Sequence, residues 1–231
     1  MRRPLIAAAL GLALAACSNG EVNPIVVAAV GEILPGERGA EPKAPPVPVT
    51  RAALTRADVA AIQVRLVEDE SRAQTLLFAA SDNGGYVTYS SALRQNFTLR
   101  GSWITGTRGV GWDLLSATSS RPDPLVTPIP VGSWPRQVQR TYEFTAFAPQ
   151  GKIQTFTCTY EVGEPQEIVI VEDRHVGVVV SETCTGEAGS FENLHLADAR
   201  TGFVWRSLQW LGPRQGLVEL RIVVPYTGRR S

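Results

Sequence analysis

The chain has 231 residues, 44% of them hydrophobic, and its 22 basic residues balance 22 acidic ones. This apolar content excludes a largely disordered chain, and the length suits one sizeable domain. No basic block or stripe interrupts the sequence, which argues against nucleic acid as a partner.

The N-terminus has the pattern of a secretory signal peptide. Basic Arg2 and Arg3 precede an apolar run at residues 5–16, which is too short to span a bilayer because a span needs about 20 residues. Leu14-Ala15-Ala16-Cys17 resembles a bacterial lipobox, in which Cys17 becomes the acylated N-terminus after cleavage. We therefore expect residues 1–16 to be removed. Cys17 would carry a diacylglycerol and an N-acyl chain such as palmitate, and no other cofactor is expected. The alternative is a plain signal peptide with Cys17 near the cut by chance.

The residues after Cys17 predict a cellular location and a tether. Ser18 stands where the usual inner-membrane retention signal is aspartate, so we expect the periplasmic face of the outer membrane, with the lipid as the anchor. Residues 17–54 form the lipidated N-terminus and the tether. Five prolines within residues 35–48 exclude a helix or a central strand and predict an extended spacer.

The remaining cysteines predict a disulfide. Lipid consumes one of the three, which leaves Cys158 and Cys184 as a pair in an oxidising compartment. Two buried free thiols are the alternative.

Residues 55–231 are expected to form one β-rich domain. A capping-box-like start at Thr55 predicts one short helix that continues to Ile62. Short β-rich segments follow at spacings near ten residues, separated by turn residues such as Asn83-Gly84 and Gly163-Glu164-Pro165. The clearest expected strands are residues 74–80, 86–90, 138–147, 153–162, 166–172, 175–183, 191–197, 203–210 and 217–224.

The fold class that follows is all-β. It is a single antiparallel β-meander domain with one short N-terminal helix, built as a curved sheet, a barrel-like sheet or a sandwich. Alternation places Phe156, Cys158 and Tyr160 on one face, which predicts a buried side of the sheet. Five prolines within residues 121–135 predict a long surface excursion in place of a core strand.

Few residues form a chemical motif. The glycine-rich segment at residues 106–111 lacks the order of a dinucleotide fingerprint and the Walker lysine, so we interpret it as bulges and close backbone approaches. His175 and His195 have no partner at metal-ligand spacing, and Gly-x-Ser-x-Gly is absent. Carboxylates at Glu161, Glu164 and nearby could in principle flank a sugar bond, but acids at turns are ordinary for solubility. We therefore predict no catalytic residue and no metal site.

Tryptophan is abundant for one small domain, with five residues of this type. Trp205 and Trp210, with Arg206 and Gln209 beside them, are the candidate contacts for a glycan or a partner, because an aromatic face and polar donors suit a sugar ring. Core packing and capping of a sheet edge is the alternative interpretation.

Several segments together resemble the YjbF/GfcB family of outer-membrane lipoproteins encoded with exopolysaccharide and group 4 capsule genes. The similarity covers most of the mature chain, from about residue 55 to residue 225. The segments are Leu14-Ala15-Ala16-Cys17, Gly106-Thr107-Arg108-Gly109-Val110-Gly111-Trp112-Asp113-Leu114, Arg140-Thr141-Tyr142, Gly202-Phe203-Val204-Trp205-Arg206-Ser207 and Gln209-Trp210-Leu211-Gly212-Pro213. The resemblance implies a β-rich periplasmic domain that takes part in export or assembly of surface polysaccharide, with no accepted catalytic residues.

Three functions are compatible with these observations. The first is a non-enzymatic accessory lipoprotein that contacts polysaccharide or other exopolysaccharide-export proteins. The second is a periplasmic polysaccharide-modifying enzyme, a hydrolase or lyase, which would need two carboxylates facing each other across a groove. The third is a structural lipoprotein that binds only protein, for which a large exposed apolar patch is typical.

Overall fold

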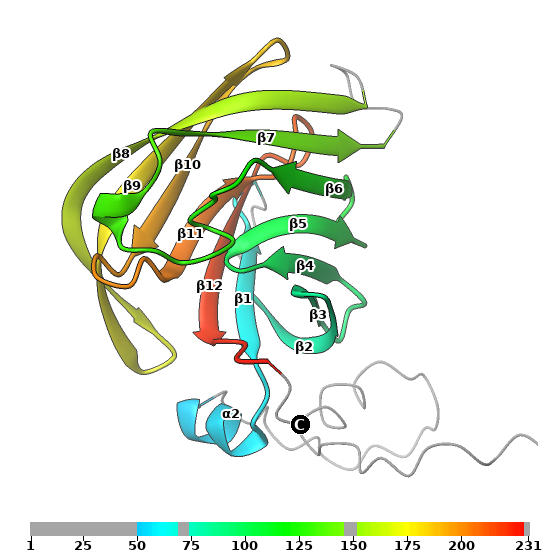
Figure 1. The fold of residues 1–231 in the computed structure, drawn as a ribbon. Helices are drawn as coiled ribbons and strands as arrows, with labels where there is room; N and C mark the ends of the chain where they lie inside the picture. Colours follow the sequence, from blue (N-terminus) through cyan, green and yellow to red (C-terminus); the bar gives the residue numbers. More distant parts are fainter. Residues whose placement is uncertain (1–49, 69–73, 146–151, 229–231) are drawn as a thin grey trace, which may run out of the picture. The chain divides into compact units, whose positions relative to one another are not determined.

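The computed structural model describes residues 50–68, 74–145 and 152–228. The signal peptide, Cys17 and most of the tether lie outside these residues. Helix α2 is followed by twelve strands and a short 3-10 helix, η1 (Figure 1). The elements are α2 Arg51–Ala57, β1 Ala61–Leu66, β2 Thr75–Asn83, β3 Tyr86–Ser90, β4 Asn96–Arg100, β5 Trp103–Arg108, β6 Leu114–Ser119, η1 Val131–Ser133, β7 Gln137–Phe144, β8 Ile153–Ile170, β9 Asp173–Gly186, β10 Gly189–Ala197, β11 Val204–Trp210 and β12 Leu217–Val224.

All twelve strands belong to one antiparallel sheet, in the order β5-β4-β3-β2-β1-β12-β11-β10-β9-β8-β7-β6. Strands that follow each other in sequence pair, except β5 and β6, and the pairing of β1 with β12 joins the two halves of this meander. The sheet curls until its edge strands β5 and β6 face each other, which makes it nearly closed and barrel-like (Figure 1). The all-β prediction is confirmed, and the barrel-like form is the one adopted.

In the described sheet no ladder of main-chain hydrogen bonds joins β5 and β6. Hydrogen bonds from side chains close the seam between these two strands. The backbone N–H of Leu114 donates to Thr107 Oγ1 at 2.9 Å, and Arg108 Nη1 donates to Leu114 O at 3.3 Å. Asp113 accepts from the backbone N–H groups of Gly109 and Val110 at 3.0 and 3.2 Å. Gly109, Val110 and Gly111 thus form the capped turn of this seam, whereas residues 106–108 belong to β5. The predicted bulge and close approach are both present: the register between β4 and β5 shifts between Thr98 and Leu99, and a Cβ atom added at Gly109 would lie 2.9 Å from Arg94 O.

Alternation along the strands fills the interior with apolar and aromatic side chains. Phe156 and Cys158 are buried, and Tyr160 packs against the same core. Trp210 stacks on Phe191 with ring centroids 4.2 Å apart and meets Tyr142 edge-on at 5.5 Å. The predicted disulfide is present and joins directly opposite residues of β8 and β9, Cys158 and Cys184.

The helix prediction was wrong in its position. Helix α2 begins at Arg51, where Thr50 acts as N-cap and its Oγ1 accepts from the backbone N–H of Ala53 at 3.2 Å. The helix ends at Ala57, and its C-cap Asp58 adopts a left-handed conformation with a φ of 49°. Ile62 lies in β1 opposite Leu77 of β2, and its side chain is fully buried in the core, which favours the strand over the predicted helix.

The segment Gly163-Glu164-Pro165 is not the predicted turn. It lies within the 18-residue strand β8, where the register against β9 shifts between Val162 and Pro165. A bulge accommodates Pro165 because proline lacks the N–H that a regular ladder needs. The chain reverses instead at Val171 and Glu172, which both have positive φ.

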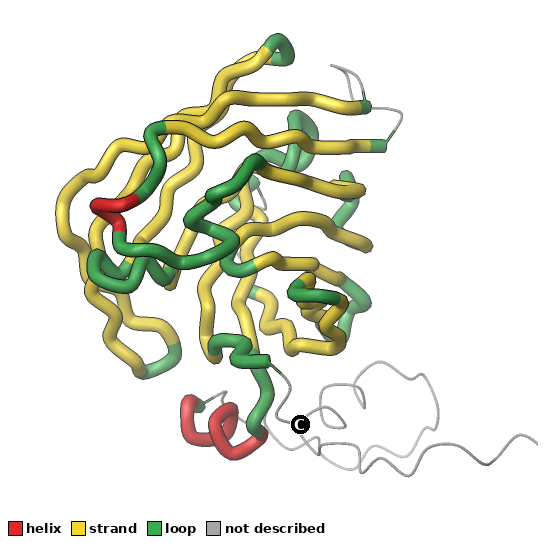
Figure 2. Tube along the Cα trace, in the orientation of Figure 1, coloured by secondary structure: helices red, strands yellow, loops and turns green. Residues whose placement is uncertain are grey.

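The proline-rich segment between β6 and β7 contains no strand, as predicted, but it is not only a surface excursion. In Figure 2 it is the loop that carries the short red 3-10 helix. Asp123, Leu125 and Val131 from this loop are buried. The loop is tied to two neighbouring turns, because Leu125 O accepts from the backbone N–H of Ser102 at 2.8 Å and Ala199 O accepts from that of Val131 at 3.1 Å.

Candidate functional site

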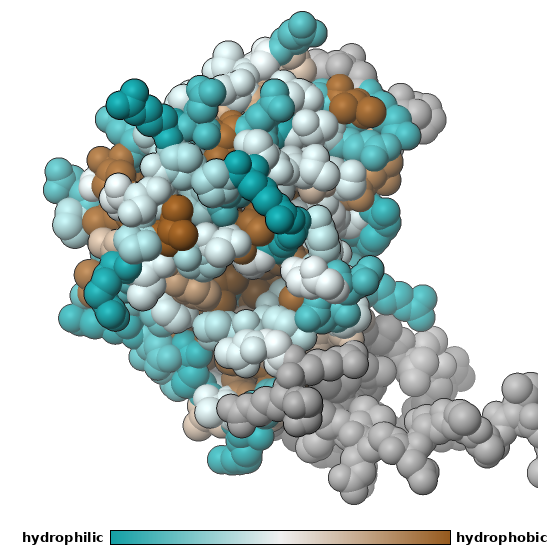
Figure 3. All heavy atoms as spheres, in the orientation of Figure 1, coloured by the Kyte–Doolittle hydropathy of each residue, from teal (hydrophilic) through white to brown (hydrophobic). Residues whose placement is uncertain are grey.

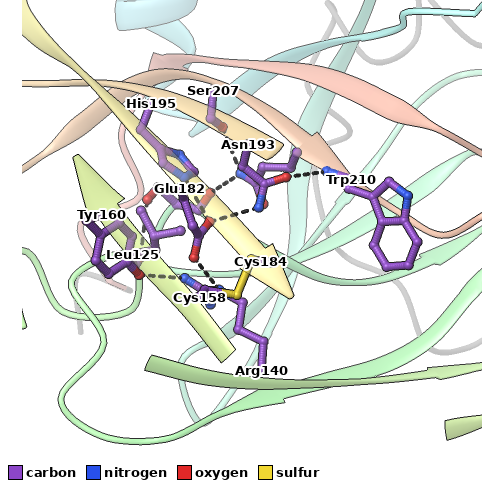
Figure 4. Close-up of polar contacts among 12 residues, drawn as sticks. Leu125, Arg140, Cys158, Tyr160, Glu182, Cys184, Asn193, His195, Ser207 and Trp210 are labelled. Atoms are coloured by element: carbon purple, nitrogen blue, oxygen red, sulfur yellow. Dashed lines mark hydrogen bonds and ion pairs between the residues drawn. A yellow bond between two sulfur atoms is a disulfide. The ribbon is translucent and has the colours of Figure 1, made fainter. Parts of the chain in front are cut away.

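A buried ionic cluster occupies the interior of the sheet, centred on Arg140 of β7 (Figure 4). The Arg140 Nε donates to Glu182 Oε1 of β9 at 2.7 Å, and Nη1 donates to Asp123 Oδ2 of the β6–β7 loop at 2.7 Å. The same guanidinium donates to the Tyr160 hydroxyl at 3.0 Å and lies 4.4 Å from the ring centre of Trp103. Burial alone would lower the pKa of Arg140, but the surrounding Glu182, Tyr160 and Asp123 raise it well above its usual value.

Glu182 links Arg140 to the next strand. Its second oxygen, Oε2, accepts from Asn193 Nδ2 at 2.8 Å and lies 3.1 Å from His195 Nε2. Burial alone would raise the pKa of Glu182, but Arg140, His195 and Asn193 together hold it well below its usual value. Asn193 in turn accepts the backbone N–H of Trp210 at 2.7 Å, so the cluster extends from β7 to β11.

His195 and Ser207 are directly opposite residues of β10 and β11, and both are buried. A serine, a histidine and a carboxylate on adjacent strands are the residue types of a nucleophilic triad. Here His195 Nε2 faces Glu182, its Nδ1 has no hydrogen-bond partner among the described residues, and the Ser207 hydroxyl accepts from Gln209 Nε2 at 2.7 Å. These buried side chains hold neighbouring strands together and have no contact with solvent.

The donor atoms of Cys158, Cys184 and Glu182 lie within 4.8 Å of one another, which is close enough for a metal site. The two sulfur atoms are bonded to each other, so neither is the thiolate that a metal would need. These residues fit a disulfide beside an ion pair and not a metal centre.

The four candidate contact residues do not form one exposed surface. Gln209 is buried, with its amide donating to Ser102 O at 2.7 Å and accepting from the backbone N–H of Ile104 at 2.9 Å. Trp210 lies in the aromatic core. Trp205 stacks on His175 with ring centroids 3.8 Å apart, and Arg206 donates to Glu219 at 2.6 Å.

An exposed tryptophan that the site prediction did not include lies at one end of the sheet. Trp112 is 46% exposed, and the guanidinium of Arg214 lies 4.3 Å from its ring centre. The two residues come from the loops β5–β6 and β11–β12, and Gln215 Oε1 ties these loops by accepting the backbone N–H of Trp112 at 3.2 Å. The position of Trp112 between a glycine-rich turn and a strand was the available signal, because an aromatic residue in a tight loop has few ways to become buried.

The acids that could in principle flank a sugar bond are exposed. Glu161, Glu164 and Glu167 lie along β8, and Glu167 pairs with Arg174 at 3.0 Å across the hairpin. The buried acids Asp123 and Glu182 face one guanidinium and not an open groove.

Fold and cluster together define a class of protein: a single, nearly closed antiparallel sheet that encloses a buried ionic cluster. The chain belongs to the YjbF family, because the family model described as group 4 capsule polysaccharide lipoprotein gfcB, YjbF, matches residues 23–223. It is thus a lipoprotein associated with capsule polysaccharide.

The crystal structure of the hypothetical lipoprotein YmcC from Escherichia coli K12 has the same fold. The two share 18% sequence identity with a TM-score of 0.63, over 78% of this chain and 91% of that one. No curated protein sequence matches the chain. Within the described ranges, no helix is long and apolar enough to cross a membrane.

Proposed function

We propose that this protein is a non-enzymatic accessory factor for export or assembly of surface polysaccharide, anchored at the periplasmic face of the outer membrane. The observation that carries the proposal is the match to a family described by capsule polysaccharide and by lipoprotein, which extends over nearly the whole chain after Cys17. The lipobox at Cys17 and the proline-rich tether supply the means of holding the β domain near a membrane.

The structure supports an accessory role because its reactive groups are used internally. Arg140, Glu182 and Asp123 satisfy one another inside the sheet, and the Ser207 hydroxyl bonds to Gln209. A polymer cannot reach side chains that have no solvent contact, so binding falls to the outside of the molecule.

The exterior offers polar surface with separate aromatic residues. On the face shown in Figure 3, hydrophobic residues lie in isolated spots and in a recess near the centre, surrounded by hydrophilic ones. Such a surface favours a polar polymer over a purely apolar protein contact. Trp112 with Arg214 is the best-exposed aromatic contact, while Trp205 and Arg206 keep part of their side chains outside the core.

The proposal is tested by complementing a deletion strain with the wild-type gene or with Cys17→Ser, which cannot be lipidated. We expect the deletion to lower the amount of polysaccharide at the cell surface, the wild type to restore it, and Cys17→Ser to fail although the protein is made. Surface polysaccharide that is unchanged by the deletion would contradict the proposal. New reducing ends in polymer incubated with the purified protein would show an enzyme instead.

A further inference from the structure

We propose that a segment of polysaccharide chain binds in a polar groove on the outside of β3–β6, along the seam between β5 and β6. This inference rests on the proposed function and deepens it by assigning the surface that takes the polymer. The groove has a volume of about 640 Å3, within the usual range for ligand sites.

The groove lies on the face that these strands turn away from the core. Val87 and Phe97 point into the core, whereas their sequence neighbours Thr88 and Thr98 line the groove. Twelve residues line it, and seven of these carry a hydroxyl group, of which that of Thr107 is buried and already bonded to Asp113 and to the N–H of Leu114. Arg108 is the only charged residue among them, so the described lining contains no acid.

This lining matches the chemistry of a sugar polymer. A hydroxyl group offers one donor and two acceptor positions, so the contact between Thr88 Oγ1 and Thr98 Oγ1 at 3.1 Å leaves both groups able to bond further. Asn96 adds an amide at the same wall. Arg108 supplies a positive charge for any acidic group on the polymer, and nothing in the lining would repel such a group.

Gly106 forms the floor of the groove. A Cβ atom added there would lie 3.5 Å from Leu115 O and 3.9 Å from Thr98 Cβ, which are ordinary contact distances. The backbone of Gly106 is not in the left-handed region, so a side chain is possible there without strain. The missing side chain is therefore what keeps the groove open.

The seam itself does not offer a place for an added peptide strand. Strand addition requires free main-chain groups at a sheet edge. At Leu114 the N–H already donates to Thr107 Oγ1 and the carbonyl already accepts from Arg108. The occupant that the groove fits is consequently a hydroxyl-rich chain lying over the seam.

The test uses the full-length protein and polysaccharide purified from the surface of the bacterium that produces it, with affinity measured by titration calorimetry. Gly106→Leu fills the floor, and we expect it to weaken binding by about tenfold or more. Thr98→Val removes one hydroxyl while keeping the side-chain shape, and we expect about threefold weaker binding from the loss of one hydrogen bond. Gly132→Leu is the matched control, because no atom lies within 4 Å of a Cβ atom added there and its backbone is also outside the left-handed region.

Wild-type affinity in Gly106→Leu and Thr98→Val would overturn the groove and leave the proposed function standing. Equal loss in Gly132→Leu would overturn it as well, since the effect would not be specific to the groove. A wild-type protein that binds no polysaccharide also overturns it, and complementation of the deletion strain then decides the proposed function separately. Thermal melting of each variant shows whether it is folded, and Thr98→Val keeps the test decisive if Gly106→Leu does not fold.

Discussion

Arg140 holds a positive charge at a position without solvent contact, and this is possible only because its partners come from several parts of the fold. Glu182 and Asp123 supply two carboxylates, and Tyr160 and Trp103 supply an oxygen and an aromatic face. Removing one partner of a buried ion pair leaves the other charge unpaired, which typically costs about 3–5 kcal/mol. Replacing either charged partner of Arg140 is therefore expected to lower the stability of the fold.

Glu182→Gln keeps the shape of the side chain and removes its charge. At pH 7 we expect the variant to be less stable than the wild type by about 3 kcal/mol. The folded protein holds the pKa of Glu182 below its usual value of 4.5, so ionised Glu182 contributes its full stability above that pH. The contribution is lost as pH falls below about 4.5, so the gap between the two proteins should narrow there.

Denaturant unfolding of both proteins from pH 7 to pH 3 measures this gap. Glu161→Gln serves as the control, because Glu161 is an exposed glutamate of β8, and it should follow the wild type at every pH. A gap that stays constant across the whole pH range would show that Glu182 does not act through its charge.

Among the elements, the β6–β7 loop is held against the β10–β11 turn by close backbone contact. Gly202 has a φ of 73°, and a Cβ atom added there would lie 1.8 Å from Ile129 O. Gly84 has a similar φ of 62° but no atom within 4 Å of such a Cβ. Comparing an alanine substitution at each glycine therefore separates two contributions to the free energy of unfolding, the left-handed backbone conformation and the steric clash.

Gly84→Ala is expected to lower the free energy of unfolding by about 1 kcal/mol, which is the cost of a left-handed alanine. Gly202→Ala should lower the free energy of unfolding by about 3 kcal/mol or more, because the clash with Ile129 O forces the loop to move away. Urea unfolding gives both values, and limited proteolysis should cut the Gly202→Ala protein faster within residues 120–136. Equal losses in the two variants would mean that the loop is not held at Ile129.

The disulfide fastens the long β8–β9 hairpin beside the ionic cluster. Its two cysteines are 26 residues apart, for which chain entropy predicts a contribution of roughly 3 to 4 kcal/mol. The double variant Cys158→Ala/Cys184→Ala should lose about that much stability. A reducing agent should bring the wild type to the same level and leave the double variant unchanged. If reduction leaves the wild type as stable as before, the bridge does not constrain the unfolded chain.

Most strands could be predicted because each is short, β-rich and bounded by turn residues. Residues 86–90 and 217–224 form the expected strands without change of bounds, as β3 and β12. Gly163-Glu164-Pro165 misled because glycine and proline mark bulges as well as turns, and only pairing with β9 distinguishes the two. Thr50 and Thr55 both offer a hydroxyl that could cap the N-terminus of a helix. The helix starts after Thr50, because Ile62 is buried as part of β1 and the helix must therefore end before this strand.

The ionic cluster could be predicted only in part. Glu182 lies between Val180 and Cys184 on the same side of β9, so alternation was a signal that could have found a carboxylate on the buried face. Its partner Arg140, and Asp123 on the other side of the same guanidinium, lie 42 and 59 positions earlier in the chain, and no local pattern relates them to Glu182. The register of the whole sheet and the path of the loop bring these residues together.

In the molecule as a whole, the meander forms a nearly closed sheet with a filled interior, so a polymer would bind to its outer surface. The edge strands β5 and β6 are joined by side chains, and the groove that lies over this seam is the surface to which we assign the polymer. A lipid on Cys17 and the tether would place this surface near the membrane. We therefore propose that the anchored protein holds polysaccharide without altering it.

The most direct measurement is co-sedimentation of the host's surface polysaccharide with lipid vesicles that carry the full-length, lipidated protein. We expect that polysaccharide sediments with these vesicles in a saturable way, that empty vesicles leave it in solution, and that its length distribution is unchanged. Polysaccharide that stays in solution would show that the protein does not hold it, and recovery in shorter chains would show that the protein cleaves it.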